Sequence, residues 1–225
     1  MEFGRAFTYA FEDPEWMKKV GIAALVFLIP IVGSIIVMGW GLEITRRVIN
    51  NDPQPLPDWT NFGEFLSKGF KAFVVSLAYV LPIILISVCG QVVMTLALTS
   101  SSGDSNSDAL AGFATIGMFC VVCLVSLFGI VAGIILPAAH GNLAATGELG
   151  SAFRFNEVIG LVRAAPGPYV LLVVVVGLTS ALLAPIGTLV CGIGVLLTSA
   201  YTAVISAHLT GQAYKSAKAT QTSTF

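Results

Sequence analysis

Long apolar runs alternate with short charged segments along the chain, and the charges mark the boundaries between them. Four stretches contain no Asp, Glu, Lys or Arg: 20–42, 72–103, 109–147 and 164–214. A helix needs about 20 apolar residues to cross the hydrocarbon core of a bilayer. The second and third stretches each predict one crossing and the fourth predicts two, with a break at Ala184–Gly187. The predicted crossings are 72–99, 113–139, 169–184 and 191–214.

The first stretch, 20–42, allows two interpretations. It is too short to cross twice, which needs about 40 residues, but Ile29–Gly33 places Pro30 and Gly33 at its centre. Proline interrupts helical hydrogen bonding and glycine tolerates a reversal. We therefore predict a short re-entrant hairpin whose turn is covered by the other helices. A single tilted crossing with an external N-terminus is the alternative.

The distribution of positive charge predicts the orientation of the chain. Lys and Arg in short loops stay in the cytoplasm. The segment Ser100–Asp108 carries two Asp and no cation, so it is predicted to be external. With the first stretch folded back on itself, all 11 Lys and Arg become cytoplasmic, as do both termini.

A short Phe-rich or amphipathic segment precedes each hydrophobic hairpin. The apolar positions follow the spacing of one helical face: Phe3, Phe7 and Phe11; Phe62, Phe65, Leu66, Phe70 and Phe73; Phe155, Val158, Ile159 and Val162. Such helices lie in the membrane interface. The whole chain, 1–225, is then one membrane domain: a first unit at 1–50, a Pro-rich connector at 51–60, further units at 61–148 and 149–214, and a cytoplasmic tail at 215–225.

Composition agrees with this class and excludes others. Hydrophobic residues make up 56% of the chain and charged residues 10%, against about 25% charged in soluble domains. A net charge of −1 provides no basic field for nucleic acid. Two His and four Cys form no recognisable metal set, and the common catalytic motifs are missing. We predict no enzymatic activity, no catalytic residue and no cofactor.

Five motifs occur in an order that resembles a known family. They are Phe11–Trp16 followed by Lys18 and Lys19, Ile29–Gly33, Pro55–Trp59, Ala152–Phe155 and Ala207–Tyr214. Together, from about Phe3 to Tyr214, they resemble the prokaryotic membrane family called domain of unknown function 4013. The resemblance implies a bacterial or archaeal cell-membrane protein and no particular reaction. A distant, purely architectural likeness is to the membrane domain that accompanies some glycerophosphodiester phosphodiesterases.

Two polar stripes inside apolar runs form the candidate site. Tyr201, His208 and Gln212 share one helical face, and so do Ser87, Gln91 and Thr95. Polar groups inside a membrane either bond neighbouring helices or line a functional path. Helix packing is the favoured interpretation, and a polar cavity between the stripes is the alternative.

Four smaller expectations concern packing. Gly129-x-x-x-Gly133 is expected to let another helix approach closely. Glu43 is expected to pair with Arg46 and Arg47 one turn away. His140 is expected to lie near Glu148, and the cysteines to pack among helices as small hydrophobes.

The favoured function is a non-enzymatic structural or accessory membrane protein that binds lipids or a partner. Its partners would be membrane lipids together with an unidentified membrane protein or a second copy of the chain. The alternative is a small-solute or lipid transporter or channel with a polar intramembrane cavity. That alternative is weakened because no charge lies inside the predicted crossings.

Overall fold

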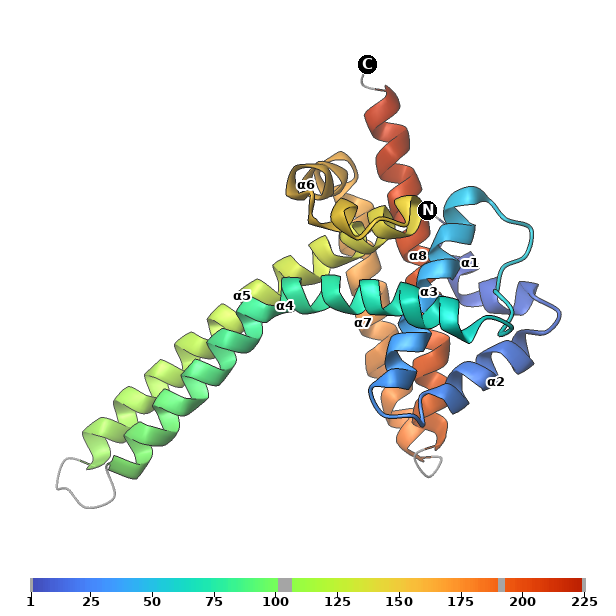
Figure 1. The fold of residues 1–225 in the computed structure, drawn as a ribbon. Helices are drawn as coiled ribbons and strands as arrows, with labels where there is room; N and C mark the ends of the chain where they lie inside the picture. Colours follow the sequence, from blue (N-terminus) through green and yellow to red (C-terminus); the bar gives the residue numbers. More distant parts are fainter. Residues whose placement is uncertain (1, 101–106, 190–192, 224–225) are drawn as a thin grey trace. The chain divides into compact units, whose positions relative to one another are not determined.

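The computed structural model describes residues 2–100, 107–189 and 193–223, and all regular structure in these residues is helical (Figure 1). The α-helices are α1 (Phe3–Thr8), α2 (Trp16–Val26), α3 (Val32–Asn50), α4 (Phe62–Ser100), α5 (Ser107–Thr146), α6 (Phe155–Ala164), α7 (Pro166–Leu189) and α8 (Ile193–Ser223). Two 3-10 helices, η1 (Tyr9–Glu12) and η2 (Leu149–Phe153), lie between them. The predicted all-helical class is confirmed.

The chain divides into two compact units. Unit 1 comprises residues 1–75 and 134–225, and unit 2 comprises residues 76–133. Each unit is described by itself below.

In unit 1, α8 is the central helix and contacts α1, η1, α2, α3, α6 and α7. The hydroxyl of Thr45 on α3 donates a hydrogen bond of 3.1 Å to the carbonyl of Ala207 on α8. One turn further along both helices, a Cβ on Gly211 would lie 2.7 Å from the side chain of Val48. The two contacts show that α3 and α8 run side by side in the same direction.

The core of unit 1 gathers segments that are far apart in the sequence. Trp40 and Ile44 of α3, Leu56 of the connector and Val204 of α8 are all fully buried in one cluster. Tyr9 and Ala10 of η1 and Ala23 of α2 belong to the same cluster. The N-terminal segments and the Pro-rich connector are therefore part of the core and not appendages to it.

The predicted reversal in the first apolar stretch is present. α2 ends at Val26, α3 begins at Val32, and Ile31 between them has a positive φ of 63°. A Cβ on Gly33 would lie 1.9 Å from the carbonyl oxygen of Val26, so only glycine fits this close return. The prediction that other helices cover the turn was wrong, because Leu28, Ile29 and Ile31 are all exposed.

Several helices are longer than the sequence pattern predicted. The second Phe-rich segment and the crossing after it form one helix, α4, which contains Pro82. The break expected at Ala184–Gly187 was wrong, since α7 continues through Pro185 to Leu189. Within the described residues, three helical segments are long and apolar enough to cross a membrane by length and composition: Phe62–Leu96, Thr115–Thr146 and Pro166–Leu189. They indicate a multi-pass membrane protein, and the fourth crossing, within α8, stays a prediction.

Unit 2 is a hairpin formed by the second half of α4 and the first part of α5. The two helices pack closely at Gly90, where a Cβ would lie 2.8 Å from the side chain of Val121. Their outer surfaces are apolar and exposed, with Val93, Leu96, Ile116, Phe119 and Ile130 each at least 60% exposed. Most of the predicted external loop, Ser100–Asp108, lies outside the described residues.

Candidate functional site

The stripe predicted on α8 packs against the N-terminal segment of the chain. The hydroxyl of Tyr201 donates to the carbonyl of Phe7 at 2.6 Å. The ring of His208 lies 4.0 Å from the ring of Tyr9, and His208 itself is buried. The backbone N–H of Glu2 donates to Oε1 of Gln212 at 3.0 Å. All three side chains therefore have partners in α1, η1 or the residue that precedes them.

These contacts fix the hydrogen bonding of His208. Because Oε1 of Gln212 accepts from Glu2, Nε2 of Gln212 is the donor in its 2.7 Å contact with Nε2 of His208. A neutral imidazole then carries its proton on Nδ1. That atom is buried and has no hydrogen-bond partner among the described residues. His208 is thus held as a neutral packing residue.

The second predicted stripe, Ser87, Gln91 and Thr95, belongs to unit 2. The hydroxyl of Thr95 donates to the carbonyl of Gln91 in the same helix at 2.8 Å. Gln91 and Thr95 are exposed, and Ser87 is half-buried. Each stripe is thus accounted for within its own unit, and a cavity shared by the two stays a prediction.

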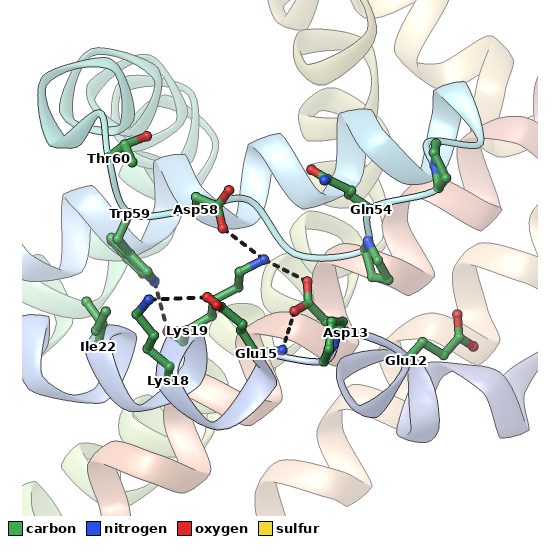
Figure 2. A pocket seen from close by; sticks show the side chains of 13 residues that line it. Glu12, Asp13, Glu15, Lys18, Lys19, Ile22, Gln54, Asp58, Trp59 and Thr60 are labelled. Carbon is green, nitrogen blue, oxygen red and sulfur yellow. Dashed lines mark hydrogen bonds and ion pairs between the residues drawn. The ribbon is translucent and has the colours of Figure 1, made fainter.

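A cluster of charged residues that the sequence analysis did not single out as a site joins three segments of unit 1. Nζ of Lys19, on α2, lies 2.8 Å from Oδ2 of Asp13 and 3.0 Å from Oδ1 of Asp58 (Figure 2). Nζ also donates to the carbonyl of Leu56 at 2.9 Å. The side chains of Lys19 and Asp13 are only 9% and 3% exposed. Lys19 therefore fastens α2 to the turn before it and to the connector.

The surroundings of this pair favour the charged form of both side chains, because they lower the pKa of Asp13 and raise the pKa of Lys19. Burial raises the pKa of Asp13, but hydrogen bonds from Lys19 and from the backbone of Glu15 outweigh burial and leave the pKa below its ordinary value. Burial lowers the pKa of Lys19, and the bonds to Asp13 and Asp58 outweigh it in the other direction. The contribution of Asp13 to stability is thus complete above about pH 3.9 and is lost as the pH falls through its lower folded value. The contribution of Lys19 is complete below about pH 10.4 and is lost only as the pH rises through its higher folded value.

The Pro-rich connector is held through its carbonyl groups. Proline supplies no backbone N–H, so this segment cannot form a helical ladder and its carbonyls need other donors. The hydroxyl of Tyr9 donates to Pro55 and Nε1 of Trp40 donates to Pro57, each at 3.1 Å. The guanidinium of Arg47 donates to Leu56 at 3.0 Å. The ring of Trp59 stacks on that of Trp40. Nε1 of Trp59 donates to the carbonyl of Lys19 (Figure 2).

Beside this cluster lies an open pocket of about 570 Å³, which Figure 2 shows from close by. Glu15, Lys18, Asp58 and Trp59 line it together with residues of the connector. Lys18 and Glu15 form an exposed ion pair of 3.2 Å across its rim. Every acid in the pocket has a basic or backbone partner, so the cluster has the chemistry of a structural clamp. The sequence contained one local signal for this cluster, because Lys19 is the charged residue that directly precedes the first apolar run and follows Asp13 by six residues.

On the other face of α2 lies an apolar groove of about 500 Å³. Its walls come from η1 and α2 on one side and from α7 and α8 on the other. They are formed by Phe11, Trp16, Met17, Val20, Gly21, Leu183, Leu197, Thr198 and Tyr201. The hydroxyl of Thr198 donates to its own helix at Val195, and that of Tyr201 donates to Phe7. The groove therefore offers an apolar surface and few free polar groups.

A smaller pocket of about 230 Å³ lies among α3, α4, α5 and α8 within unit 1. Its polar lining consists of Ser34, Thr45, His140, Ser206 and Thr210. His140 was expected near Glu148, but its Nε2 lies 3.4 Å from the carbonyl of Ala72. This recess has polar side chains in its lining, as the cavity predicted from the sequence would, but none of the predicted stripe residues lines it.

The remaining packing expectations have mixed outcomes. Glu43 does pair with Arg46, at 3.5 Å, but its shortest ion pair is with Lys68, at 2.5 Å. A Cβ on Gly129 would meet nothing within 4 Å among the described residues, so no helix of the same chain approaches there, and a contact with a second copy stays a prediction. Cys89, Cys120 and Cys123 are exposed on the hairpin of unit 2 and not packed among helices. Among the described residues, no group of three or more metal-binding side chains occurs.

Comparison with known proteins gives a family. Residues 22–192 match the family described as "Protein of unknown function (DUF4013)". The matched range contains the α2–α3 turn and the Pro-rich connector but leaves Asp13 and Lys19 outside. No curated protein and no solved structure matches the chain. Since the match spans well over half of its length, the chain belongs to the DUF4013 family.

Proposed function

We propose that this protein is a non-enzymatic structural or accessory component of the prokaryotic cell membrane that binds membrane lipid along its N-terminal segments. The observation that carries the proposal is the apolar groove between α2 and the α7–α8 pair. An acyl chain has no polar groups to satisfy and gains free energy from apolar contact. A groove of about 500 Å³ is large enough for a long stretch of one such chain.

The α2–α3 hairpin supports insertion from the same side. Its turn exposes Leu28, Ile29 and Ile31. The backbone N–H groups of residues 27, 28, 29, 32 and 33 all donate to carbonyls within the hairpin. Backbone that is satisfied internally tolerates hydrocarbon. Most of the backbone N–H groups at this turn are satisfied in this way, which favours a re-entrant position in lipid without cover from other helices.

The topology that we propose is the one that the sequence pattern predicts. Four helices cross the membrane, the hairpin enters and returns, and the Phe-rich segments lie at the interface. Both termini and all cationic segments are cytoplasmic, and the segment Ser100–Asp108 is external.

Fluorescence of Trp16 tests lipid binding, because Trp16 lines the groove while Trp40 and Trp59 are buried. The purified full chain in detergent is titrated with phospholipid that carries brominated acyl chains, which quench nearby tryptophan. The difference between the wild type and Trp16→Phe reports Trp16 alone. We expect quenching of this component to saturate at low lipid content, as one chain occupies one site.

Gly21→Leu, which fills the groove, should abolish the saturable quenching. Gly63→Leu is the matched control, because a Cβ at Gly63, like one at Gly21, meets nothing within 4 Å but lies away from the groove. Quenching that rises linearly with lipid, or that survives Gly21→Leu unchanged, would contradict the proposal.

Transport of a small neutral solute is the second candidate function. The pocket that contains His140 and the hydroxyls of Ser34 and Ser206 favours it. Transport needs a continuous polar path to both membrane surfaces. A recess of about 230 Å³ would form only one part of such a path. Lipid binding needs no such path, which is why it is the main proposal.

A further inference from the structure

The outer face of α4 in unit 2 carries a regular stripe of exposed side chains. Leu77, Leu81, Ile84, Val88, Gln91 and Thr95 recur at alternating intervals of four and three residues, and all six are exposed. This is the spacing of the seam between two helices in a left-handed coiled coil, a geometry common in membrane bundles. The stripe therefore has the residue spacing of a helix–helix interface, but its side chains are exposed and no second helix packs on them among the described residues.

Gln91 is the group on this stripe that most needs a partner. Its side-chain amide has two donor hydrogens and an acceptor oxygen, and none of the described residues is seen to bond it. Thr95 differs, because its hydroxyl is already satisfied within α4. Lipid tails offer no hydrogen bonds, so a bare amide in the middle of an apolar helix is costly.

We propose that two copies of this chain associate through α4, with the Gln91 amides hydrogen-bonded to each other across a twofold axis. An amide both donates and accepts, so Gln91 is complementary to itself. Copies inserted in the same orientation have parallel α4 helices, and a twofold axis along the membrane normal brings identical positions together. Gln91 then meets Gln91 of the second copy in the same layer of the seam, where a polar residue fixes register.

The chemistry favours a second copy over another part of the same chain. The polar side chains of the α8 stripe have partners of their own within unit 1. Tyr201 donates to Phe7, and Gln212 bonds both His208 and Glu2. Other stripes of exposed residues also run along α4. We choose this one because it contains Gln91, whose amide needs a hydrogen-bond partner. The inference concerns unit 2 alone and does not depend on the lipid groove in unit 1.

Cysteine crosslinking in native membranes tests the interface. In a full chain whose four native cysteines are replaced, Val88→Cys places a thiol on the stripe while Gln91 is kept. Val93→Cys is the matched control, since Val93 is also exposed but lies on the opposite side of the helix. Under mild oxidation we expect a disulfide-linked dimer from Val88→Cys and little from Val93→Cys.

Adding Gln91→Leu to the Val88→Cys chain should weaken dimerisation by roughly 3- to 20-fold, and Gln91→Asn, which keeps an amide, should restore part of it. In detergent the wild type should have twice the 23.5 kDa mass of one chain. Equal crosslinking at the two positions, a monomeric mass, or a Val88→Cys adduct with a different protein would each overturn the proposal. So would a monomer in which Val88→Cys is shielded from maleimide, because the rest of the chain would then cover the stripe.

Discussion

Lys18 and Lys19 are neighbours in the sequence but lie in opposite environments. The side chain of Lys18 is 68% exposed and pairs with Glu15. Lys19 is almost fully buried and has three oxygen partners, from Asp13, Leu56 and Asp58. Exposed ion pairs contribute little to stability, whereas loss of one partner of a buried pair leaves an uncompensated charge.

Lys19→Met should therefore lower the free energy of unfolding by about 3–5 kcal/mol, because it leaves the buried carboxylate of Asp13 without its positively charged partner. Lys18→Met is the matched control and should change it by less than about 1 kcal/mol. The measurement is reversible unfolding of the purified protein in mixed micelles by titration with a denaturing detergent. Asp13→Asn added to Lys19→Met should recover part of the loss. Equal effects of the two lysine substitutions would show that Lys19 is not a buried clamp.

Single residues were predictable where the relevant partner is close in sequence. The pairing of Glu43 with Arg46 follows from one helical turn, and it is present. The stronger bond from Lys68 joins residues 25 positions apart, so no local rule could find it. The cysteines were expected inside helix packing because they are small and apolar, but Cys89, Cys120 and Cys123 on α4 and α5 are exposed. Cys191 lies outside the described residues. Composition alone does not say which face of a uniformly apolar helix is buried.

At the scale of elements, the turn between α2 and α3 was predictable because it is a local event at Pro30 and Gly33. Helix ends were not. Pro82, Pro137 and Pro185 all lie inside helices. In apolar surroundings the chain keeps its helical hydrogen bonds wherever it can, and helices tolerate the interruption that one proline causes. Within the apolar runs, Pro30 lies at a helix break, and there a close return of the backbone accompanies it.

The crossing of α3 and α4 is a second element-scale feature that the pattern did not reveal. A Cβ on Gly39 would lie 1.8 Å from the carbonyl oxygen of Phe65, and one on Gly69 would lie 1.8 Å from that of Ile35. Glycine at both positions lets the two backbones touch. The sequence pattern Gly129-x-x-x-Gly133 suggested such a contact elsewhere, because spacing identifies a small-residue face but not what lies against it.

Gly69→Ala should destabilise the protein by about 1–3 kcal/mol, since the added methyl group forces α3 and α4 apart. Gly63→Ala, on the same helix with nothing within 4 Å of the new Cβ, is the control. Alanine favours a helix more than glycine does, and it does so at least as much inside the helix at Gly69 as at Gly63, the second residue of α4. A lower stability of Gly69→Ala therefore reflects the contact. The same detergent titration measures it. A Gly69→Ala protein as stable as Gly63→Ala would mean that the two helices do not touch at this point.

For the molecule as a whole, the register of α3 on α8 sets the depth of the hairpin. Thr45 lies beside Ala207 on helices that run in the same direction. Ile31, at the turn, precedes Thr45 by 14 residues, a helical distance of about 21 Å. The turn is therefore level with the first residues of α8. If α8 crosses the membrane, the hairpin reaches most of the way through the hydrocarbon, deeper than a half-depth loop.

Cysteine accessibility in intact cells tests this topology in a chain with its native cysteines replaced. We expect Lys68→Cys to react with an impermeant maleimide only after permeabilisation, because cations stay in the cytoplasm. Ser105→Cys, in the predicted external segment, should react in intact cells. Ile31→Cys should react in neither condition, because the proposed re-entrant hairpin would hold its exposed side chain in lipid, where thiolate does not form. If 20–42 instead crosses the membrane once, the N-terminus is external. Labelling of a Glu2→Cys chain in intact cells would therefore exclude the re-entrant hairpin.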